Sequence, residues 1–425
     1  MIRPRIAALA ILVVPFALSA QTIAISGGKV YPVSGPPLER GTVLIRDGRI
    51  VALGADVTIP AGAQRIDATG KVVTPGFING ATLVGLDEIS AVSSTRESVA
   101  RGHDRIAAAF RPWEGLNPRS VLIGPTRDAG VTAFVVMPSG GLISGQVAVL
   151  RVANGGVSDM LLRAPVGMVA NLGPTGGPEA RPRAETLSRL REVLEDTRVF
   201  RARRSDYERA QTRELTASRL DMEALVPVLE GREPLLVRVD RASDIETAMG
   251  IAREYGIKLI VSGGAEAWML ADRLAAAKIP VLTGAMTNVP TDFSTLGRRQ
   301  ETAGLLARAG VPVILIGNAF GGSAEAFTAR NVRYEAGNAV AYGMEWNAAL
   351  RAITLTPAET FGVADRVGSL SVGKLADVVV WSGDPFEFAT RPEHVFVNGV
   401  ESRTPSREDL LEARYRSLPP RYRGP

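Results

Sequence analysis

The sequence predicts an α/β protein, with a TIM-like barrel of eight parallel strands and a small β-sandwich domain formed by both ends of the chain. Two observations carry this prediction. The middle of the chain alternates short apolar runs with helical stretches, a pattern typical of a parallel α/β architecture. Both ends show short strands joined by tight turns, with the hairpin signals Asp47-Gly48 and Asn398-Gly399.

The start of the chain has the composition of an export signal. Arg3 and Arg5 provide positive charge, residues 6–18 are mostly apolar, and the small residues Ser19 and Ala20 follow. The apolar run contains Pro15 and is short for a membrane span, and no other segment is long or apolar enough to be one. We expect a signal peptide over residues 1–20 and a periplasmic or secreted protein, with an uncleaved anchor as the alternative.

The composition excludes several classes of function. The chain has 425 residues, with 49 Lys and Arg against 44 Asp and Glu, and it has no cysteine. Disulfides and a lipid-modified cysteine anchor are therefore excluded. Aromatic residues are few and do not interleave with the basic ones, so a nucleic-acid surface would lack its stacking partners. We expect no nucleic acid as a partner, and no membrane beyond the signal peptide.

The two β segments are each too small to bury a core, so they are expected to pack together. The first covers residues 21–73 and the second covers residues 366–405, which gives one discontinuous β domain. Residues 406–425 are expected to form a short helix and a loose tail.

Residues 74–365 supply the expected barrel, whose strand candidates number the eight that a closed barrel needs. These candidates are residues 76–83, 131–137, 146–152, 166–172, 235–239, 259–262, 280–282 and 313–317. Helices are expected over residues 243–255, 265–276 and 302–309. The segment 180–229 is rich in Arg and Glu and predicts one or two long solvated helices inserted after the fourth strand. We interpret this insertion as a surface excursion, with a partner-docking face as the alternative.

Specific motifs stand at the two borders of the barrel. Residues 72–83 read VVTPGFINGATL, residues 355–358 read LTPA, and residues 368–380 read GSLSVGKLADVVV. These stretches resemble the border motifs of the metal-dependent amidohydrolase superfamily, in particular its imidazolonepropionase-like, exported branch. The resemblance covers roughly residues 23–402. It implies a barrel with a composite β domain, and a zinc or other divalent ion that activates water at the C-terminal mouth.

The residues that would hold this metal in the family are replaced. The family's first strand ends in Asp-x-His-x-His, imidazoles come from strands five and six, and an aspartate comes from strand eight. The matching positions hold Ala81, Leu83, Arg238, Ser262 or Gly263, and Asn318. Residues two apart on a strand point the same way, so Ala81 and Leu83 are expected to keep the geometry of a histidine pair without its ligand atoms. We therefore expect no metal cofactor.

The rest of the chain offers few substitutes for these ligands. Its two histidines are His103, expected at the surface or in a loop near the mouth, and His394, expected to be structural in the C-terminal β segment. Lys258 and Lys278 precede strands, which predicts a position at the bottom rim of the barrel, away from any metal-bridging position.

Carboxylates are a further possibility, because oxygen ligands converging at a barrel mouth could bind Mg²⁺ or Ca²⁺. Asp87 and Glu88 follow the first strand, and Asp240 and Glu266 follow the fifth and sixth. Salt bridges and helix caps are the alternative roles for them. The glycine-rich segments 138–146 and 171–178 are expected as loops that shape a pocket at the rim.

Three functional hypotheses remain open. In the first, the chain is an exported amidohydrolase-family protein without the metal centre. It is then a non-catalytic or partner subunit, which binds a small molecule or peptide through Arg238, Asn318 and Asn79. Its partner would be an intact amidohydrolase relative or a second copy. In the second, it hydrolyses C–N bonds at a metal-poor site, with Arg238 as carboxylate anchor or oxyanion stabiliser and Asp240 or Glu266 as base. In the third, it is a structural interaction protein that works through its Arg/Glu-rich helices.

Overall fold

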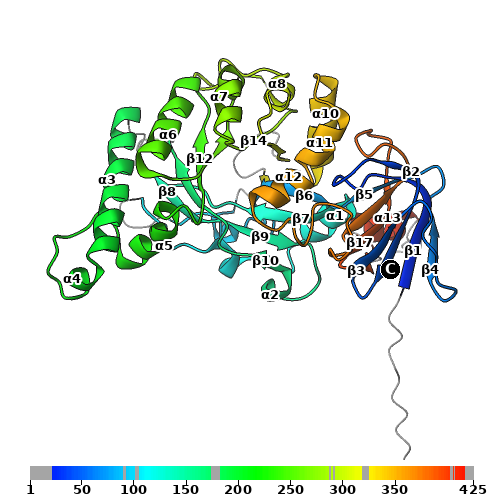
Figure 1. Cartoon of the computed structure of the whole chain (residues 1–425). Helices are drawn as coiled ribbons and strands as arrows, with labels where there is room; N and C mark the ends of the chain where they lie inside the picture. The colour runs from blue at the N-terminus through cyan, green and yellow to red at the C-terminus, as the bar shows by residue number, and fades with distance from the viewer. Residues whose placement is uncertain are drawn as a thin grey trace, which may run out of the picture.

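The computed structural model describes residues 22–89, 92–100, 105–173, 182–286, 289–290, 292–317, 325–402, 405 and 407–416. It has two parts, a β-rich part made from both ends of the chain and a larger α/β part between them (Figure 1). The expected signal peptide, His103, Asn318 and residues 417–425 lie outside the described residues.

Strands from the two ends of the chain form one eight-stranded sheet, as the sequence predicted. The strands are β1 (Thr22–Val30), β2 (Leu38–Arg46), β3 (Arg49–Gly54), β4 (Gln64–Asp67), β5 (Val72–Pro75), β16 (Val378–Trp381), β17 (Pro392–Val397) and β18 (Val400–Glu401). Their order is β18-β17-β16-β5-β1-β2-β3, and β4 pairs with β1. The seam lies at β5, which pairs in parallel with β1 and antiparallel with β16.

This composite domain is a single sheet and not the two stacked sheets of the expected β-sandwich. Arg49 in β3 forms an isolated bridge with Leu375, just before β16, and the Ile50 N–H donates to the Lys374 carbonyl at 3.0 Å. The sheet therefore curls until its far strand meets the segment that leads into its C-terminal half. The curl encloses an apolar core, so no second sheet is needed to cover the inner face.

The α/β part contains a strand at each of the eight predicted segments. Its strands are β6 (Phe77–Thr82), β7 (Val131–Val136), β8 (Ile143–Gln146), β9 (Ala148–Arg151), β10 (Leu161–Arg163), β11 (Met168–Asn171), β12 (Leu235–Val239), β13 (Leu259–Gly263), β14 (Val281–Thr283) and β15 (Val313–Leu315). β6 and β7 are parallel, and β11 to β15 are parallel in chain order.

The third predicted strand, residues 146–152, does not run parallel to its neighbours, so that part of the prediction was wrong. β8 pairs antiparallel with β11, and β9 pairs antiparallel with β7. A parallel connection needs a crossover of a dozen or more residues, usually through a helix. The described chain between β7 and β8 contains no helix, so it turns back directly.

The barrel is also not closed, contrary to prediction. The described strands of the α/β part form two sheets, β10-β9-β7-β6 and β15-β14-β13-β12-β11-β8. β6 and β15 approach each other closely, because a Cβ on Gly80 would lie 2.3 Å from Ile314 Cγ2. Part of the β6 edge is used elsewhere, since the Ile78 N–H donates to the Ile353 carbonyl at 2.7 Å.

Helices accompany these strands. They are α1 (Ile123–Asp128), α2 (Val157–Met160), α3 (Arg183–Ala202), α4 (Arg204–Glu208), α5 (Arg219–Leu229), α6 (Ala242–Tyr255), α7 (Ala271–Ala276), α8 (Thr302–Arg308), α9 (Glu325–Thr328), α10 (Val332–Ala341), α11 (Trp346–Ala352) and α12 (Leu355–Thr360). A further helix, α13 (Arg407–Arg416), follows the last strand of the composite domain. None of the helices in the described part of the chain is long and apolar enough to cross a membrane.

The Arg/Glu-rich insertion is not the solvated surface excursion that its composition suggested. α3 buries Leu190, Val193, Leu194 and Phe200, and α5 buries Met222 and Leu225, in the same core as the strands. Both helices therefore cover the sheet, at the end of the molecule away from the composite domain (Figure 1). Their apolar stripes were masked in the sequence by the many charges on the opposite faces.

Candidate functional site

Three polar side chains form a row at the C-terminal ends of adjacent parallel strands. Asn171 on β11 is in register with Arg238 on β12, and Arg238 is in register with Ser262 on β13. The residues two positions earlier on these strands all lie in the apolar core that the strands enclose. Because side chains two apart point the same way, the row faces the interior at the mouth of the strands.

Asn171 fixes the glycine-rich loop beside this row. Its Nδ2 donates to the carbonyls of Gly140 at 3.3 Å and Gly141 at 2.8 Å, and to Ser144 Oγ at 2.8 Å. Gly140 and Gly141 have φ of 86° and 68°, which glycine adopts without steric cost. The sequence predicted a rim loop here but not the residue that holds it. An Asn at an inward-facing strand end was the available signal.

Arg238 occupies the centre of the row and is partly buried. Its carbonyl accepts the N–H groups of Leu172 at 3.1 Å and Gly173 at 3.3 Å, so the backbone on both sides of the row is fixed. A guanidinium that is partly removed from water needs hydrogen-bonding partners of opposite charge or polarity. The structure thus places Arg238 where the sequence predicted it, at the mouth and facing inward.

Asp240 and Glu266, the predicted base candidates, cap backbone groups. Asp240 Oδ1 accepts the Ala265 N–H at 3.2 Å and lies 4.0 Å from Arg298 Nη2. Glu266 Oε2 accepts the N–H of Ala242, the first residue of α6, at 2.9 Å, and its Oε1 accepts the Gly297 N–H at 3.2 Å. Burial raises the pKa of Asp240 above its ordinary value. Both carboxylates therefore hold the loops that follow β12 and β13.

The two positions that match the family's histidine pair do not share one environment, so that prediction was wrong. Ala81 lies in the core between the strands with Met137 and Ile316, whereas Leu83 lies in a separate core with Trp113. Both side chains are buried. β6 ends before Leu83, and its pairing with β7 shifts register near that end, so the period of two is lost there.

Asn79, predicted to bind substrate, is fully buried and acts as a bridge between segments. Its Nδ2 donates to the Ala329 carbonyl at 3.0 Å, and its Oδ1 accepts the N–H groups of Ala81 at 3.2 Å and Gly317 at 3.4 Å. Asn79 thus connects β6, the end of β15 and the chain before α10. Both polar atoms of its side chain are engaged with the backbone of described residues.

Glu335 is a buried carboxylate that was not among the site residues predicted from the sequence. It is on α10, and its Oε2 accepts the N–H groups of Ala285 and of Met286, the latter at 2.7 Å, just after β14. Its Oε1 is buried and has no hydrogen-bond partner among the described residues, and burial raises the pKa of this carboxyl. An acid three residues after Val332, on the buried stripe of the helix, was the signal in the sequence.

The other carboxylates considered as oxygen ligands are dispersed. Glu88 accepts hydrogen bonds from Asn117 at 2.9 Å and Ser120 at 3.0 Å. Asp87 is buried, which raises the pKa of its carboxyl. Among the residues that the structure describes, no three His, Cys, Asp or Glu side chains gather as a metal site would require. The described donors therefore do not fit the ion that the family resemblance implies, and we derive no chemistry through it.

The remaining predicted positions are placed as follows. His394 lies in β17 with its Nδ1 2.6 Å from Glu401 Oε1, a structural position as expected. Lys258 and Lys278 lie directly before β13 and shortly before β14, at the bottom rim as expected.

A family model matches the later part of the chain. Residues 237–401, which include most of β12 and all later strands of the α/β part, match the model described as "Amidohydrolase family". The chain is 23% identical over 397 residues to "Amidohydrolase tasK" of Hapsidospora irregularis, which covers 85% of this chain and 39% of that protein. The chain thus spans well under half the length of that relative.

Solved structures give the same result. An amidohydrolase from Thermotoga maritima MSB8 matches with a TM-score of 0.79 and 27% identity, over 89% of this chain and 99% of that one. A molinate hydrolase shares the fold, with a TM-score of 0.57 and 21% identity, over 90% of this chain and 95% of that one. The chain thus resembles amidohydrolases in sequence over residues 237–401 and in fold over most of its length.

Proposed function

We propose that this protein is an exported amidohydrolase-family member that lacks the catalytic metal centre and acts as a non-catalytic, ligand-binding or partner subunit. The observation that supports this most directly is the environment of Ala81 and Leu83. Both are buried in apolar surroundings, and the two lie in different cores. An imidazole pair at these positions would lie in two separate apolar cores and not around one ion.

Metal analysis of the purified protein tests this proposal. After growth with added zinc, manganese and iron, we expect well under one equivalent of any transition metal per folded chain. A second test restores histidine at both positions. The double variant Ala81→His/Leu83→His should gain no tight zinc site, and its free energy of unfolding should be lower by roughly 2 kcal/mol or more, because polar groups are buried in apolar cores. Stoichiometric metal in the wild-type protein would contradict the proposal.

The partner role is supported by apolar side chains on the segment between β14 and α8. Phe293 is 89% exposed and Leu296 is 61% exposed, and exposed Met269 lies beside this segment because a Cβ on Gly297 would lie 2.9 Å from its Cε. Exposed apolar patches commonly mark interaction sites. We propose an intact amidohydrolase relative or a second copy as the partner. Light scattering of the wild type, alone and mixed with such a relative, against Phe293→Ser/Leu296→Ser would test this. If the wild type stays monomeric both alone and with the relative, and the double variant behaves in the same way, the partner role is contradicted.

A second candidate function is hydrolysis of C–N bonds at a metal-poor site. The raised pKa of Asp240, which lies two residues after Arg238, favours it because a general base works best with a pKa near the operating pH. Its engagement with the Ala265 N–H weighs against it, since that hydrogen bond stabilises the charged form. Turnover of dipeptides, N-acyl amino acids and cyclic amides in the presence of a chelator, lost in Asp240→Asn, would establish this function instead.

A further inference from the structure

A cavity of about 600 Å³ opens at the end of the strands opposite to the mouth. Residues that lead into β11, β12, β13 and β14, together with the end of α12, form its wall. Val166, Ile257, Ile279 and Phe361 contribute buried apolar surface to it. This volume is within the range of cavities that hold small organic molecules, roughly 300–1,000 Å³.

The lining of this cavity is strongly basic. Its cations are Arg163, Arg232, Arg253, Lys258 and Lys278, and its carboxylates are Glu233 and Glu359, which leaves three positive charges in excess. Two charges outside the lining offset each other, because Arg351 binds Glu359 with contacts of 2.7 and 2.8 Å and Glu230 binds Arg232 at 2.5 Å. The side-chain amines of Lys258 and Lys278 form no hydrogen bond or ion pair within the described part of the chain.

Helix ends account for only part of this charge. α5, α6, α7 and α12 each end at this cavity, and a helix C-terminus carries roughly half a negative charge. Four such ends amount to about 2 negative charges, which is less than the excess of three positive charges on the lining. A net positive charge of about one remains for a ligand. That excess suits a monoanion, and Glu233 in the wall disfavours a dianion.

We propose that this cavity binds a small organic monoanion, whose carboxylate pairs with Lys258 and Lys278 and whose apolar body lies on the buried surface formed around Val166, Ile279 and Phe361. The two lysines precede adjacent strands, β13 and β14, so their amines can approach one carboxylate from two sides. Lysine acts toward an anion as a point charge without strict directional demands. The site is separate from the row at the mouth, because it is at the other end of the same strands.

Calorimetric titration of the full chain with octanoate tests the proposal. We expect saturable one-to-one binding with a dissociation constant of about 1 mM or tighter. Octanamide, which has the same apolar body without the charge, and inorganic phosphate, which has charge without the body, should each bind about tenfold more weakly or worse. Absence of saturable octanoate binding, or equal binding of octanamide or phosphate, would overturn the assignment.

Paired variants locate the binding within the molecule. Lys258→Gln/Lys278→Gln should weaken octanoate binding about tenfold, because both charges are removed while the length of the side chains is kept. Lys29→Gln/Lys71→Gln removes the same charge from the composite domain, where each lysine pairs with a surface glutamate, and should leave the affinity unchanged. An equal loss in both double variants would show that only net charge matters and would refute the site.

Salt dependence gives a measurement that needs no variant. Octanoate affinity of the wild type should fall as sodium chloride rises, because exposed charges are screened over a Debye length of about 10 Å at 0.1 M salt. An affinity that stays constant or rises with salt would mean that the apolar body alone drives binding, and it would overturn the role of the lysines.

Discussion

At the scale of single residues, Asp377 shows what the C-terminal motif does. Its backbone carbonyl accepts the Gly76 N–H at 2.9 Å, and its Oδ1 accepts the Asn398 N–H at 2.7 Å. It therefore connects the entry of the first α/β strand to the turn between β17 and β18. Within the described part of the chain, Oδ2 is buried without a hydrogen-bond partner, and burial raises the pKa of this carboxyl to about 6. Asp377, in the motif of residues 368–380, thus has a structural role: it connects two segments that are distant in the chain.

The raised pKa of Asp377 predicts a pH dependence of stability. Below the unfolded-state value near 3.8 both states are protonated, and between 3.8 and about 6 the folded state binds more protons than the unfolded state. The free energy of unfolding contributed by this group therefore falls as pH rises through that window and stays low above it. Asp377→Asn keeps an acceptor for Asn398 and cannot ionise.

We expect Asp377→Asn to remove this contribution. Relative to the wild type, the variant should gain stability, on the order of 1–3 kcal/mol, as pH rises from 4 to 7. Urea unfolding of both proteins at several pH values measures the difference. A difference that does not change with pH across this window would contradict a buried, protonatable Asp377.

The sequence predicted site residues where the strand pattern was regular. Arg238 faces the mouth because β12 alternates without interruption from Leu235 to Val239. The prediction failed for Leu83, which follows the register shift at the end of β6. Glu335 was missed because its burial depends on the packing of α10 against the segment after β14, a contact between residues 50 apart in the chain.

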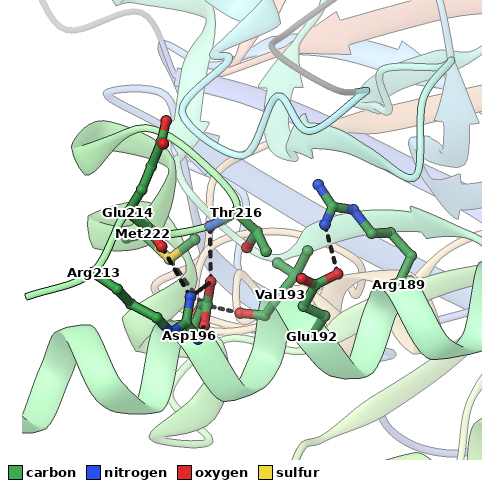
Figure 2. A network of polar contacts seen from close by, with 9 residues as sticks. Arg189, Glu192, Val193, Asp196, Arg213, Glu214, Thr216 and Met222 are labelled. Atoms are coloured by element: carbon green, nitrogen blue, oxygen red, sulfur yellow. Dashed lines mark hydrogen bonds and ion pairs between the residues drawn. The ribbon is translucent and has the colours of Figure 1, made fainter.

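At the scale of elements, the connection between α3 and α5 depends on one buried carboxylate. Asp196 on α3, with its side chain 1% exposed, accepts hydrogen bonds from the Arg213 guanidinium and from the Thr216 N–H, the latter at 2.8 Å. Figure 2 shows both contacts reaching Asp196 from the loop before α5. A nearby pair, Arg189 with Glu192, is drawn in the same view and is much more exposed at the glutamate.

We expect Asp196→Ala to destabilise this connection. The change leaves the Thr216 N–H without its acceptor, which should cost about 2–3 kcal/mol. Limited proteolysis should then cut the chain between α4 and α5 faster, and chemical unfolding should show the lower stability. Glu208→Ala serves as the control, since its pair with Arg204 is exposed on both sides and such a pair contributes about 1 kcal/mol or less. Equal effects of the two variants would contradict the role given to Asp196.

The direction of the third strand was also decided at this scale. Residues 138–145, between the predicted second and third strands, are too few for a helical crossover. The sequence therefore already favoured an antiparallel return. Counting eight apolar runs as the eight parallel strands of a barrel led to the wrong direction. The buried faces of α3 and α5 were harder to predict, because charged residues outnumber the apolar stripe on α3.

At the scale of the whole molecule, Trp381 joins the composite domain to the α/β part. It lies in β16, stacks on Phe77 of β6 with ring centroids 4.9 Å apart, and donates through Nε1 to Thr74 Oγ1 at 2.9 Å. Gly130, before β7, leaves the space for its ring, because a Cβ there would lie 2.4 Å from the Trp381 side chain. One indole thus contacts both ends of the chain and the middle.

Trp381→Ala should therefore destabilise both parts together. We expect the free energy of unfolding to fall by about 3–5 kcal/mol. Calorimetry should show one cooperative transition at a lower temperature, because both parts pack against Trp381. Phe388→Ala removes a ring that is 75% exposed and should cost about 1 kcal/mol or less. If the α/β part kept its wild-type transition in Trp381→Ala, the two parts would be energetically independent, and the coupling assigned to Trp381 would be wrong.

Local sequence patterns were sufficient to predict the class of fold, the pairing of the chain ends, the strands from β11 to β15 and the position of Arg238. These features follow from local periodicity and turn chemistry, which are written in neighbouring residues. Tertiary structure alone decided that the barrel stays open, that the composite sheet curls on itself, and that Ala81 and Leu83 lie in separate cores. Each of these depends on which distant backbone edge or apolar surface is available, and residues close in the chain do not specify that.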